Sequence, residues 1–146
     1  MQIGYSQVFS KLELSEKLIP DFIIKTATGS YVIVELEAPR ARLFTRQRHL
    51  PESRELRAAR AQMERYLSFV KNNVLYLRQR FPELSVERLQ GLIIIGLSSN
   101  MTNEEKERLK QLNYLFKEYQ IITYDELVSR MKNFLENLGV RYGLFG

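Results

Sequence analysis

The apolar side chains of this chain recur with a period of two in some segments and of three to four in others. Two β-rich runs, 21–26 and 31–37, flank the turn-forming stretch 27–30, which predicts a β-hairpin. The apolar positions of 51–79 keep helical spacing and predict one long amphipathic helix that begins at Pro51. Residues 5–12 also recur at helical spacing, so we expect a short N-terminal helix.

The second half of the chain predicts alternating strands and helices. A continuous apolar run at 91–96 is typical of a strand buried on both faces. A capping box of Thr102 and Glu105 predicts a helix that ends near Tyr119, and a short strand follows. A second capping box, Thr123 with Glu126, predicts a last helix to about residue 138, with Gly139 beyond its end. The order α-β-β-α-β-α-β-α predicts an α/β fold, a mixed sheet flanked by helices, in one domain spanning residues 1–146.

The length of the hairpin loop decides which side chains share a face of the sheet. A three-residue loop ending at Gly29 in the left-handed conformation gathers Asp21, Glu35 and Glu37 on one face and leaves the other face apolar. Three such carboxylates raise one another's pKa unless a cation lies among them, and hard oxygen ligands suit Mg²⁺ or Mn²⁺. Alternation by itself favours a simpler interpretation, in which Glu35 and Glu37 are the solvent face of a half-exposed strand.

Composition excludes several kinds of chemistry. The chain has no cysteine and one histidine, His49, which excludes disulfides, thiolate zinc sites, clustered-histidine metal sites and a cysteine nucleophile. The lack of cysteine is compatible with a cytoplasmic location. The longest apolar run has six residues, so we expect no membrane association.

The net charge of +5 is concentrated between residues 38 and 65, where eight arginines and three glutamates lie and lysine is absent. Guanidinium groups match phosphate geometry, so the first partner to consider is a nucleic-acid backbone, with a solvated, ion-paired helix face as the alternative. Six of these arginines are candidate phosphate contacts: Arg40, Arg42, Arg46, Arg48, Arg54 and Arg57.

The acidic residues occur in a recognisable order with two helix residues. Asp21 follows a proline, Glu35 and Glu37 lie on the next predicted strand, and Gln62 and Tyr66 share one face of the long helix. This order resembles the PD-(D/E)XK nuclease superfamily, whose pattern is P-D, then E-x-K, and in one branch Q-x-x-x-Y. A closer resemblance is to the nuclease domain of Shedu-type anti-phage proteins, over about residues 18–138. The matching stretches are Pro20–Phe22, Val34–Pro39, Gln62, Ile94–Gly96 and Thr123–Leu127.

The resemblance implies a metal-dependent endonuclease, with DNA the expected substrate, and a domain that usually ends a longer protein. By the resemblance, Asp21 and Glu35 would be ligands of Mg²⁺ or Mn²⁺, with Glu37 a third ligand or a base. Gln62 would position the substrate and Tyr66 would support the site from the helix.

Glu37 departs from the family pattern, which has a lysine at this position. That lysine is expected to steady the attacking water and the charge developing on phosphate, and a carboxylate has the wrong sign for this task. Lys25 is about 13 Å from Asp21 along a strand, and Arg40 could only clamp charge. Two alternatives therefore remain open: a module that binds nucleic acid without cutting, and a protein-interaction module.

Two features of the C-terminal third have mainly structural interpretations. The stretch Thr123–Leu127 is explained by its capping box. Apolar positions in the last predicted helix suit packing, either within the chain or against a second copy in a homo-oligomer; they are Val128, Met131, Phe134, Leu135 and Leu138.

Overall fold

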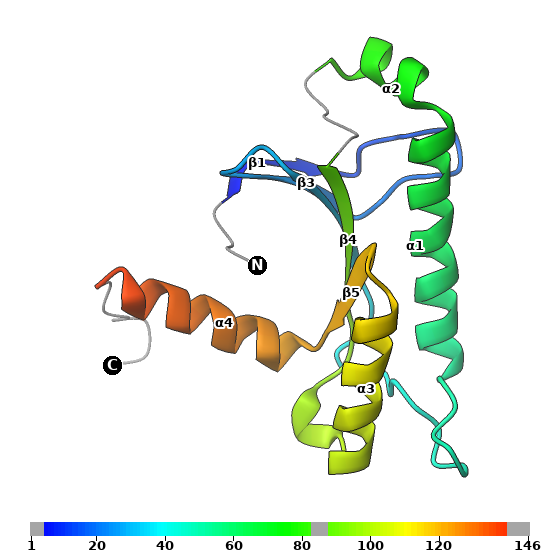
Figure 1. Ribbon diagram of the computed structural model, residues 1–146, viewed down its shortest axis with the longest axis vertical. Helices are drawn as coiled ribbons and strands as arrows, with labels where there is room; N and C mark the ends of the chain where they lie inside the picture. Colours follow the sequence, from blue (N-terminus) through cyan, green and yellow to red (C-terminus); the bar gives the residue numbers. More distant parts are fainter. Residues whose placement is uncertain (1–4, 83–87, 140–146) are drawn as a thin grey trace.

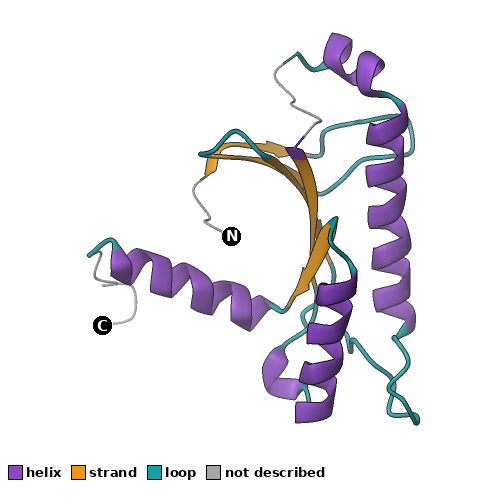
Figure 2. Ribbon diagram, in the orientation of Figure 1, coloured by secondary structure: helices purple, strands orange, loops and turns teal. Residues whose placement is uncertain are grey.

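The computed structural model describes residues 5–82 and 88–139, and its centre is a mixed five-stranded sheet (Figures 1 and 2). The strands lie in sequence order, so β1, β2 and β3 pair antiparallel while β3, β4 and β5 pair parallel. Their bounds are β1 Tyr5–Ser10, β2 Phe22–Thr26, β3 Tyr31–Leu36, β4 Leu89–Ile94 and β5 Tyr119–Ile122. The predicted α/β fold with a mixed sheet flanked by helices is confirmed.

The helices lie on both sides of this curved sheet. Helices α1 and α3 cover one face, and α4 extends away from β5 on the other side (Figure 1). Their bounds are α1 Arg54–Asn72, α2 Val74–Arg80, α3 Asn103–Leu115 and α4 Tyr124–Asn137, with a short 3₁₀ helix, η2, at Ser98–Asn100. No helix within the described ranges is long and apolar enough to cross a membrane.

The predicted N-terminal helix is wrong, because residues 5–10 form the edge strand β1. This strand pairs antiparallel with β2 and places Phe9 opposite Ile23. Val8 is exposed whereas Phe9 packs against the core, which is the alternation of a strand. A segment this short fits both periods, and the backbone hydrogen bonds to β2 decide in favour of the strand.

The predicted hairpin register is confirmed. Ile23 pairs with Ile33 and Lys25 with Tyr31, and Gly29 has a φ of +85°. Because successive side chains alternate, Ile33 and the residues two positions before and after it on β3 face α1 and the main core. Val32 and Val34 belong to a smaller cluster on the opposite face, where the start of α4 packs.

The apolar stripe of the long helix is confirmed, but the helix is divided and begins later than predicted. The Ser53 hydroxyl accepts the Leu56 N–H at 3.1 Å, so this serine, not Pro51, marks the start. At the other end Asn73 interrupts the helix, and α2 continues to Arg80. The buried stripe consists of Leu56, Ala59, Met63, Tyr66, Leu67 and Val70.

The two predicted capping boxes have different outcomes. The Thr102 hydroxyl accepts the Glu105 N–H at 3.1 Å, as predicted, although α3 ends at Leu115 because Tyr119 belongs to β5. The second box is wrong, because the Thr123 hydroxyl makes no capping bond to α4. Gly139 follows α4 with a φ of +74°, as expected.

Asp125 links the start of α4 to η2. Its carboxylate accepts the N–H groups of Ser98 and Ser99, at 2.9 and 3.1 Å, and the Ser98 hydroxyl at 2.6 Å. These bonds hold the pKa of Asp125 far below its ordinary value, although burial opposes them. The structural interpretation of Thr123–Leu127 therefore holds through the aspartate, not through the threonine.

Helix α4 leaves an apolar face exposed. None of its residues is buried, and Val128, Met131, Phe134 and Leu138 are exposed. Packing against residues 5–82 and 88–139 therefore does not account for most of the stripe.

Candidate functional site

Asp21 and Glu35 meet where β2 begins and β3 ends, and each binds the backbone of the neighbouring strand. The Asp21 N–H donates to Oε1 of Glu35 at 3.2 Å, and the Leu36 N–H donates to Oδ2 of Asp21 at 2.9 Å. These reciprocal bonds hold the two carboxylates beside each other. Glu35 is 9 % exposed, so it is not the solvent face of a half-exposed strand.

Helix α1 contributes Tyr66 and Gln62 to the same site. The buried Tyr66 hydroxyl donates to the carbonyl oxygen of Ile19 at 3.2 Å, and it lies close enough to Glu35 to affect the pKa of that carboxyl group. Burial raises the pKa of Tyr66 to about 12, the charge of Glu35 adds to this rise, and a hydrogen bond with Gln62 opposes it. The structure therefore brings Gln62, Tyr66 and Glu35 together as the sequence predicted.

Glu37 lies near the pair and carries a perturbed carboxyl group. Burial raises its pKa, and the charges of Asp21 and Glu55 raise it further. The pKa of Glu35 is also raised, by burial first and then by Asp21 and Glu37, although a hydrogen bond with Tyr66 opposes the rise. Neighbouring carboxyl groups with raised pKa values occur more often at functional sites than elsewhere on a protein.

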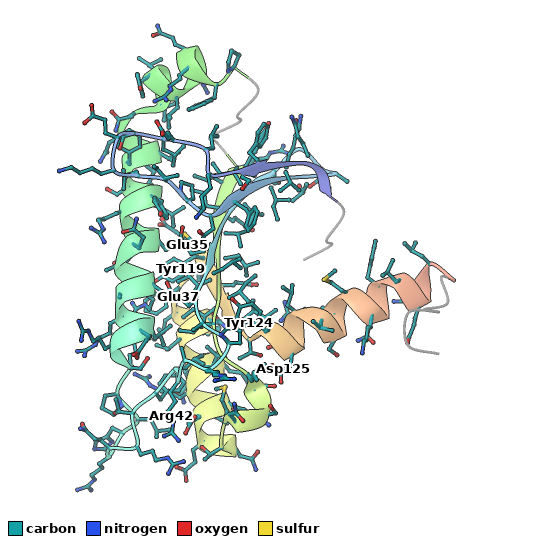
Figure 3. All side chains as sticks on the ribbon, turned by 180° about the vertical axis from the view of Figure 1, so that it is seen from behind. Glu35, Glu37, Arg42, Tyr119, Tyr124 and Asp125 are labelled. Atoms are coloured by element: carbon teal, nitrogen blue, oxygen red, sulfur yellow. The ribbon has the colours of Figure 1, made fainter. Side chains whose placement is uncertain are left out.

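The backbone of Glu37 is fixed from two sides. Its N–H donates to the Ile94 carbonyl at 2.8 Å, and its own carbonyl accepts the hydroxyl of Tyr124. Figure 3 shows Glu35, Glu37 and Tyr124 in succession along the sheet, with Arg42 in the loop beyond them. Sequence reasoning did not assign Tyr124 to the site, because its position at a helix start gave no signal of a contact with β3.

Lys11 is the second residue that sequence reasoning missed. Its ammonium forms an ion pair with Oδ1 of Asp21, and its N–H donates to the Asp21 carbonyl at 3.1 Å. Burial alone would raise the pKa of Asp21, but the bonds from Lys11 and from the Leu36 N–H bring it below its ordinary value. The expected helix over 5–12 concealed this contact, because only a strand pairs Lys11 with the start of β2.

The donor set of this site fits a magnesium ion held by two carboxylates. Over residues 5–82 and 88–139, no group of three or more His, Cys, Asp or Glu side chains is arranged to hold a metal together. Mg²⁺ is usually bound through one or two carboxylates, with waters and substrate phosphates completing its shell. Asp21 and Glu35 meet this requirement, and the role of Glu37 as a third ligand stays a prediction.

The arginine-rich loop folds against the end of β4 and the start of α3. Gly96 has a φ of +68°, and a Cβ there would lie 2.7 Å from the carbonyl oxygen of Ala41, so only glycine allows this close approach. A cavity of about 270 Å³ results, and its lining includes Arg40, Arg42 and Arg46. All three arginines are exposed and form no ion pair with another described residue.

The remaining arginines of this window divide into two groups. Arg48, Arg54, Arg57 and Arg65 are exposed, as a phosphate contact requires. Arg60 instead binds the Glu52 carboxylate, donates to the Tyr119 hydroxyl at 2.9 Å and lies 4.0 Å from the centre of the Phe116 ring. Arg60 therefore joins α1 to β5 and is not available to a ligand.

Comparison with known proteins assigns the family. The sequence model described as "Shedu protein SduA, C-terminal" matches residues 3–128, most of the chain. The chain belongs to this Shedu family. No curated protein sequence matches it.

Solved structures give more distant likenesses. One is the crystal structure of a repair endonuclease from Pyrococcus abyssi, with 17 % identity and a TM-score of 0.43 over 82 % of this chain and 38 % of that one. Another is a complex of EndoMS with double-stranded DNA, with 16 % identity and a TM-score of 0.41 over 84 % of this chain and 37 % of that one. The Shedu chain described here spans less than two-fifths of either.

Within this Shedu domain the motif residues converge from three elements. Asp21 precedes β2, Glu35 lies on β3, and Gln62 with Tyr66 lies on α1. Lys25, already too distant by sequence, lies 5.9 Å from the centre of the Tyr31 ring, away from this cluster.

Proposed function

We propose that residues 1–146 form a nuclease-like domain that hydrolyses phosphodiester bonds in DNA with Mg²⁺ or Mn²⁺, as a cytoplasmic defence against phage. The observation that carries this proposal is the reciprocal bonding of Asp21 and Glu35 beside Tyr66 and Gln62. Such a pair of partly buried carboxylates supports a cation site, and the Shedu family membership supports a nuclease activity.

In this proposal Asp21 and Glu35 hold the metal, and Glu37 serves as an additional ligand or as a base. A bound divalent ion supplies a Lewis acid for the phosphoryl oxygen and lowers the pKa of a bound water. Tyr66 and Gln62 keep the Glu35 carboxylate in place, and Gln62 positions the substrate. The rigidity of this arrangement follows from the backbone bonds between β2 and β3.

The exposed arginines of residues 40–57 hold the DNA backbone in this proposal. They lie in the loop after Glu37 and in the first turns of α1, so phosphates bound there extend from the carboxylate site. Guanidinium forks bind phosphate in a bidentate manner and carry no sequence information. The proposed binding is therefore strong at low salt and indifferent to sequence.

The decisive experiment incubates supercoiled and linear plasmid DNA with the protein in Mg²⁺, Mn²⁺ or EDTA. We expect metal-dependent nicking that is lost in Glu35→Gln and retained in the matched control Glu136→Gln, which alters an exposed residue of α4. Cleavage that continues unchanged in Glu35→Gln, or that proceeds equally in EDTA, would contradict the proposal.

A second candidate function is DNA binding without cleavage, and Glu37 is the observation that favours it. A carboxylate at this position adds negative charge where the family pattern has an ammonium. In that case the protein binds DNA with a steep salt dependence and leaves it intact in every metal. Cleavage by the unmodified protein in the experiment above excludes this candidate.

A further inference from the structure

We infer that Lys11 supplies the phosphate-facing ammonium of this site, in place of the lysine that position 37 lacks. The inference rests on the proposed nuclease function and concerns a residue outside the motif. Lys11 follows the edge strand β1, whereas the family pattern places the lysine with this role at the end of β3.

The position of Lys11 follows from the pairing of β1 with β2. Ser10, the last residue of β1, pairs with Phe22, so Lys11, which follows β1, lies opposite Asp21. The Lys11 N–H donates to the Asp21 carbonyl at 3.1 Å, and its ammonium bonds to the Asp21 carboxylate. The charge of Glu35 also acts on this ammonium and, after the larger effect of Asp21, raises its pKa.

Lys11 also has the freedom and the backbone conformation of a functional residue. Its side chain is 65 % exposed while that of Asp21 is 23 % exposed, so the ammonium lies on the open side of the site. Its φ is +51°, a left-handed conformation that is strained for a residue with a side chain. Such strain persists where surrounding contacts enforce it, and here it points the lysine at Asp21.

Among the ion pairs between described residues, only that of Lys11 reaches Asp21 or Glu35. Lys25 lies over the Tyr31 ring, and Arg60 is committed to Glu52 and Tyr119. Arg40 lines the cavity at the start of α3. Lys11 is therefore the cation that can meet a phosphate brought to Asp21 and Glu35.

The chemical role of Lys11 is electrostatic. In hydrolysis a water gives up one proton to a base or to solvent as its oxygen forms a bond to phosphorus. The bond from phosphorus to the leaving sugar oxygen breaks, and that oxygen takes a proton from solvent. Lys11 keeps its own proton throughout and donates a hydrogen bond to a non-bridging phosphoryl oxygen, where negative charge accumulates. The shift from Asp21 to the substrate requires only a rotation of its exposed side chain.

The test compares Lys11→Met with Lys11→Arg and with the matched control Lys25→Met, a lysine on the same sheet face. We measure cleavage rate at saturating DNA, affinity for Mn²⁺ by calorimetry, and DNA affinity in EDTA. Lys11→Met should lower kcat about 100- to 1,000-fold, the usual cost of removing one charge-stabilising donor. Its Mn²⁺ affinity should equal or exceed that of the unmodified protein, because the ammonium no longer competes for Asp21. DNA affinity should change less than about threefold, since one of several phosphate contacts is lost.

Two further variants separate this role from a structural one. Lys11→Arg keeps a positive charge and should retain at least about tenfold more activity than Lys11→Met. Glu37→Lys, added to Lys11→Met, returns an ammonium to the site from β3 and should restore at least about tenfold of the lost rate. Lys25→Met should cleave like the unmodified protein.

Several results would overturn the inference. One is a Lys11→Met rate within about threefold of the unmodified protein, and another is a loss of Mn²⁺ affinity as large as that of Asp21→Asn. The latter result would mean that Lys11 only holds Asp21 in position. If the unmodified protein does not cleave in any metal, the proposed function itself fails, and the role of Lys11 fails with it.

Discussion

A close contact between α1 and the sheet occurs at Gly91, and it gives a quantitative test of how α1 is positioned. A Cβ at this residue would lie 2.5 Å from Sδ of Met63 and 2.8 Å from Cβ of Tyr119. Met63 is fully buried on α1, one residue after Gln62 and three before Tyr66. A side chain on Gly91 therefore crowds α1 through Met63 and β5 through Tyr119.

We expect Gly91→Ala to lower the free energy of unfolding by about 2 kcal/mol, within the range known for overpacked cores. The flexible thioether of Met63 can move, but Cβ of Tyr119 is fixed to the β5 backbone, so the crowding cannot be fully relieved. Met63→Ala alone should cost about 2–5 kcal/mol through the cavity that it leaves. The double variant should cost at least about 0.5 kcal/mol less than the sum, because the new methyl group occupies part of that cavity.

Urea unfolding followed by circular dichroism measures these free energies, with equal m-values as the check on comparable unfolded states. Gly29→Ala is the matched control. Nothing lies within 4 Å of the Cβ that alanine would add, so this substitution strains the backbone, whose φ is +85°, without crowding a neighbour. Its cost, about 1 kcal/mol, should be additive with Met63→Ala. Strict additivity of Gly91→Ala with Met63→Ala, or a cost for Gly91→Ala below about 0.5 kcal/mol, would refute the close packing of α1 on β4.

Three further predictions follow from the charged groups. Arg60→Met should lower the free energy of unfolding, measured in urea, by about 1–3 kcal/mol, because the substitution leaves the partly buried Glu52 unpaired. Arg57→Met, which alters an exposed arginine, should change the free energy of unfolding by less than about 0.5 kcal/mol. Glu35→Gln should raise the urea midpoint of unfolding at pH 8, and this gain should shrink toward pH 4.5. The pKa of Glu35 is raised in the folded protein, so the Glu35 carboxyl group favours folding at low pH and this contribution is lost as the pH rises through the folded pKa. A gain that stays the same across this pH range would contradict the raised pKa. Arg42→Ala should weaken DNA binding about equally for all sequences and reduce the slope of log affinity against log salt by about 1. Fluorescence anisotropy measures both effects, and a loss of affinity that depends on the DNA sequence would contradict a phosphate contact.

The parts of the fold that the sequence predicted are those fixed by local pattern. The hairpin register follows from alternation and from a loop that places Gly29 in the left-handed region, and both are properties of consecutive residues. The buried stripe of α1 follows from helical spacing in the same way. The proximity of Asp21 and Glu35 is predictable from the sequence for the same reason, because the two residues share one hairpin.

The parts that the sequence could not predict depend on contacts between distant segments. The Tyr124 hydroxyl bonds to Glu37 from 87 residues away, and no spacing rule indicates such a pair. Lys11 was missed for a related reason: β1 is a strand only because β2 offers it an edge, and its own apolar spacing suits a helix equally well. Asp125, not Thr123, accepts the Glu126 N–H, at 3.2 Å, and it also binds the backbone N–H groups of η2, a segment 26 to 27 residues away.

The carboxylate site and the arginine loop carry opposite charges, and a short, rigid segment of chain joins them. The carboxylates of Asp21, Glu35 and Glu37 outnumber the one ammonium, that of Lys11, which pairs with Asp21, so a phosphate that approaches them meets net repulsion until a cation neutralises the carboxylates. The loop that follows Glu37 carries arginines without ion-pair partners among the described residues, and it attracts the same phosphate.

Ala38 joins these two surfaces. Its carbonyl accepts the N–H of Ala41 at 3.1 Å and that of Gly96 at 3.3 Å, so the start of the arginine loop is tied to the end of β4 directly after the carboxylates. These bonds fix the arginine loop relative to the carboxylates. In the proposed function, the arginines can therefore hold DNA while its scissile phosphate still lacks a favourable place. Divalent metal then matters most for the phosphate nearest Asp21, and DNA held in EDTA should be bound but uncut.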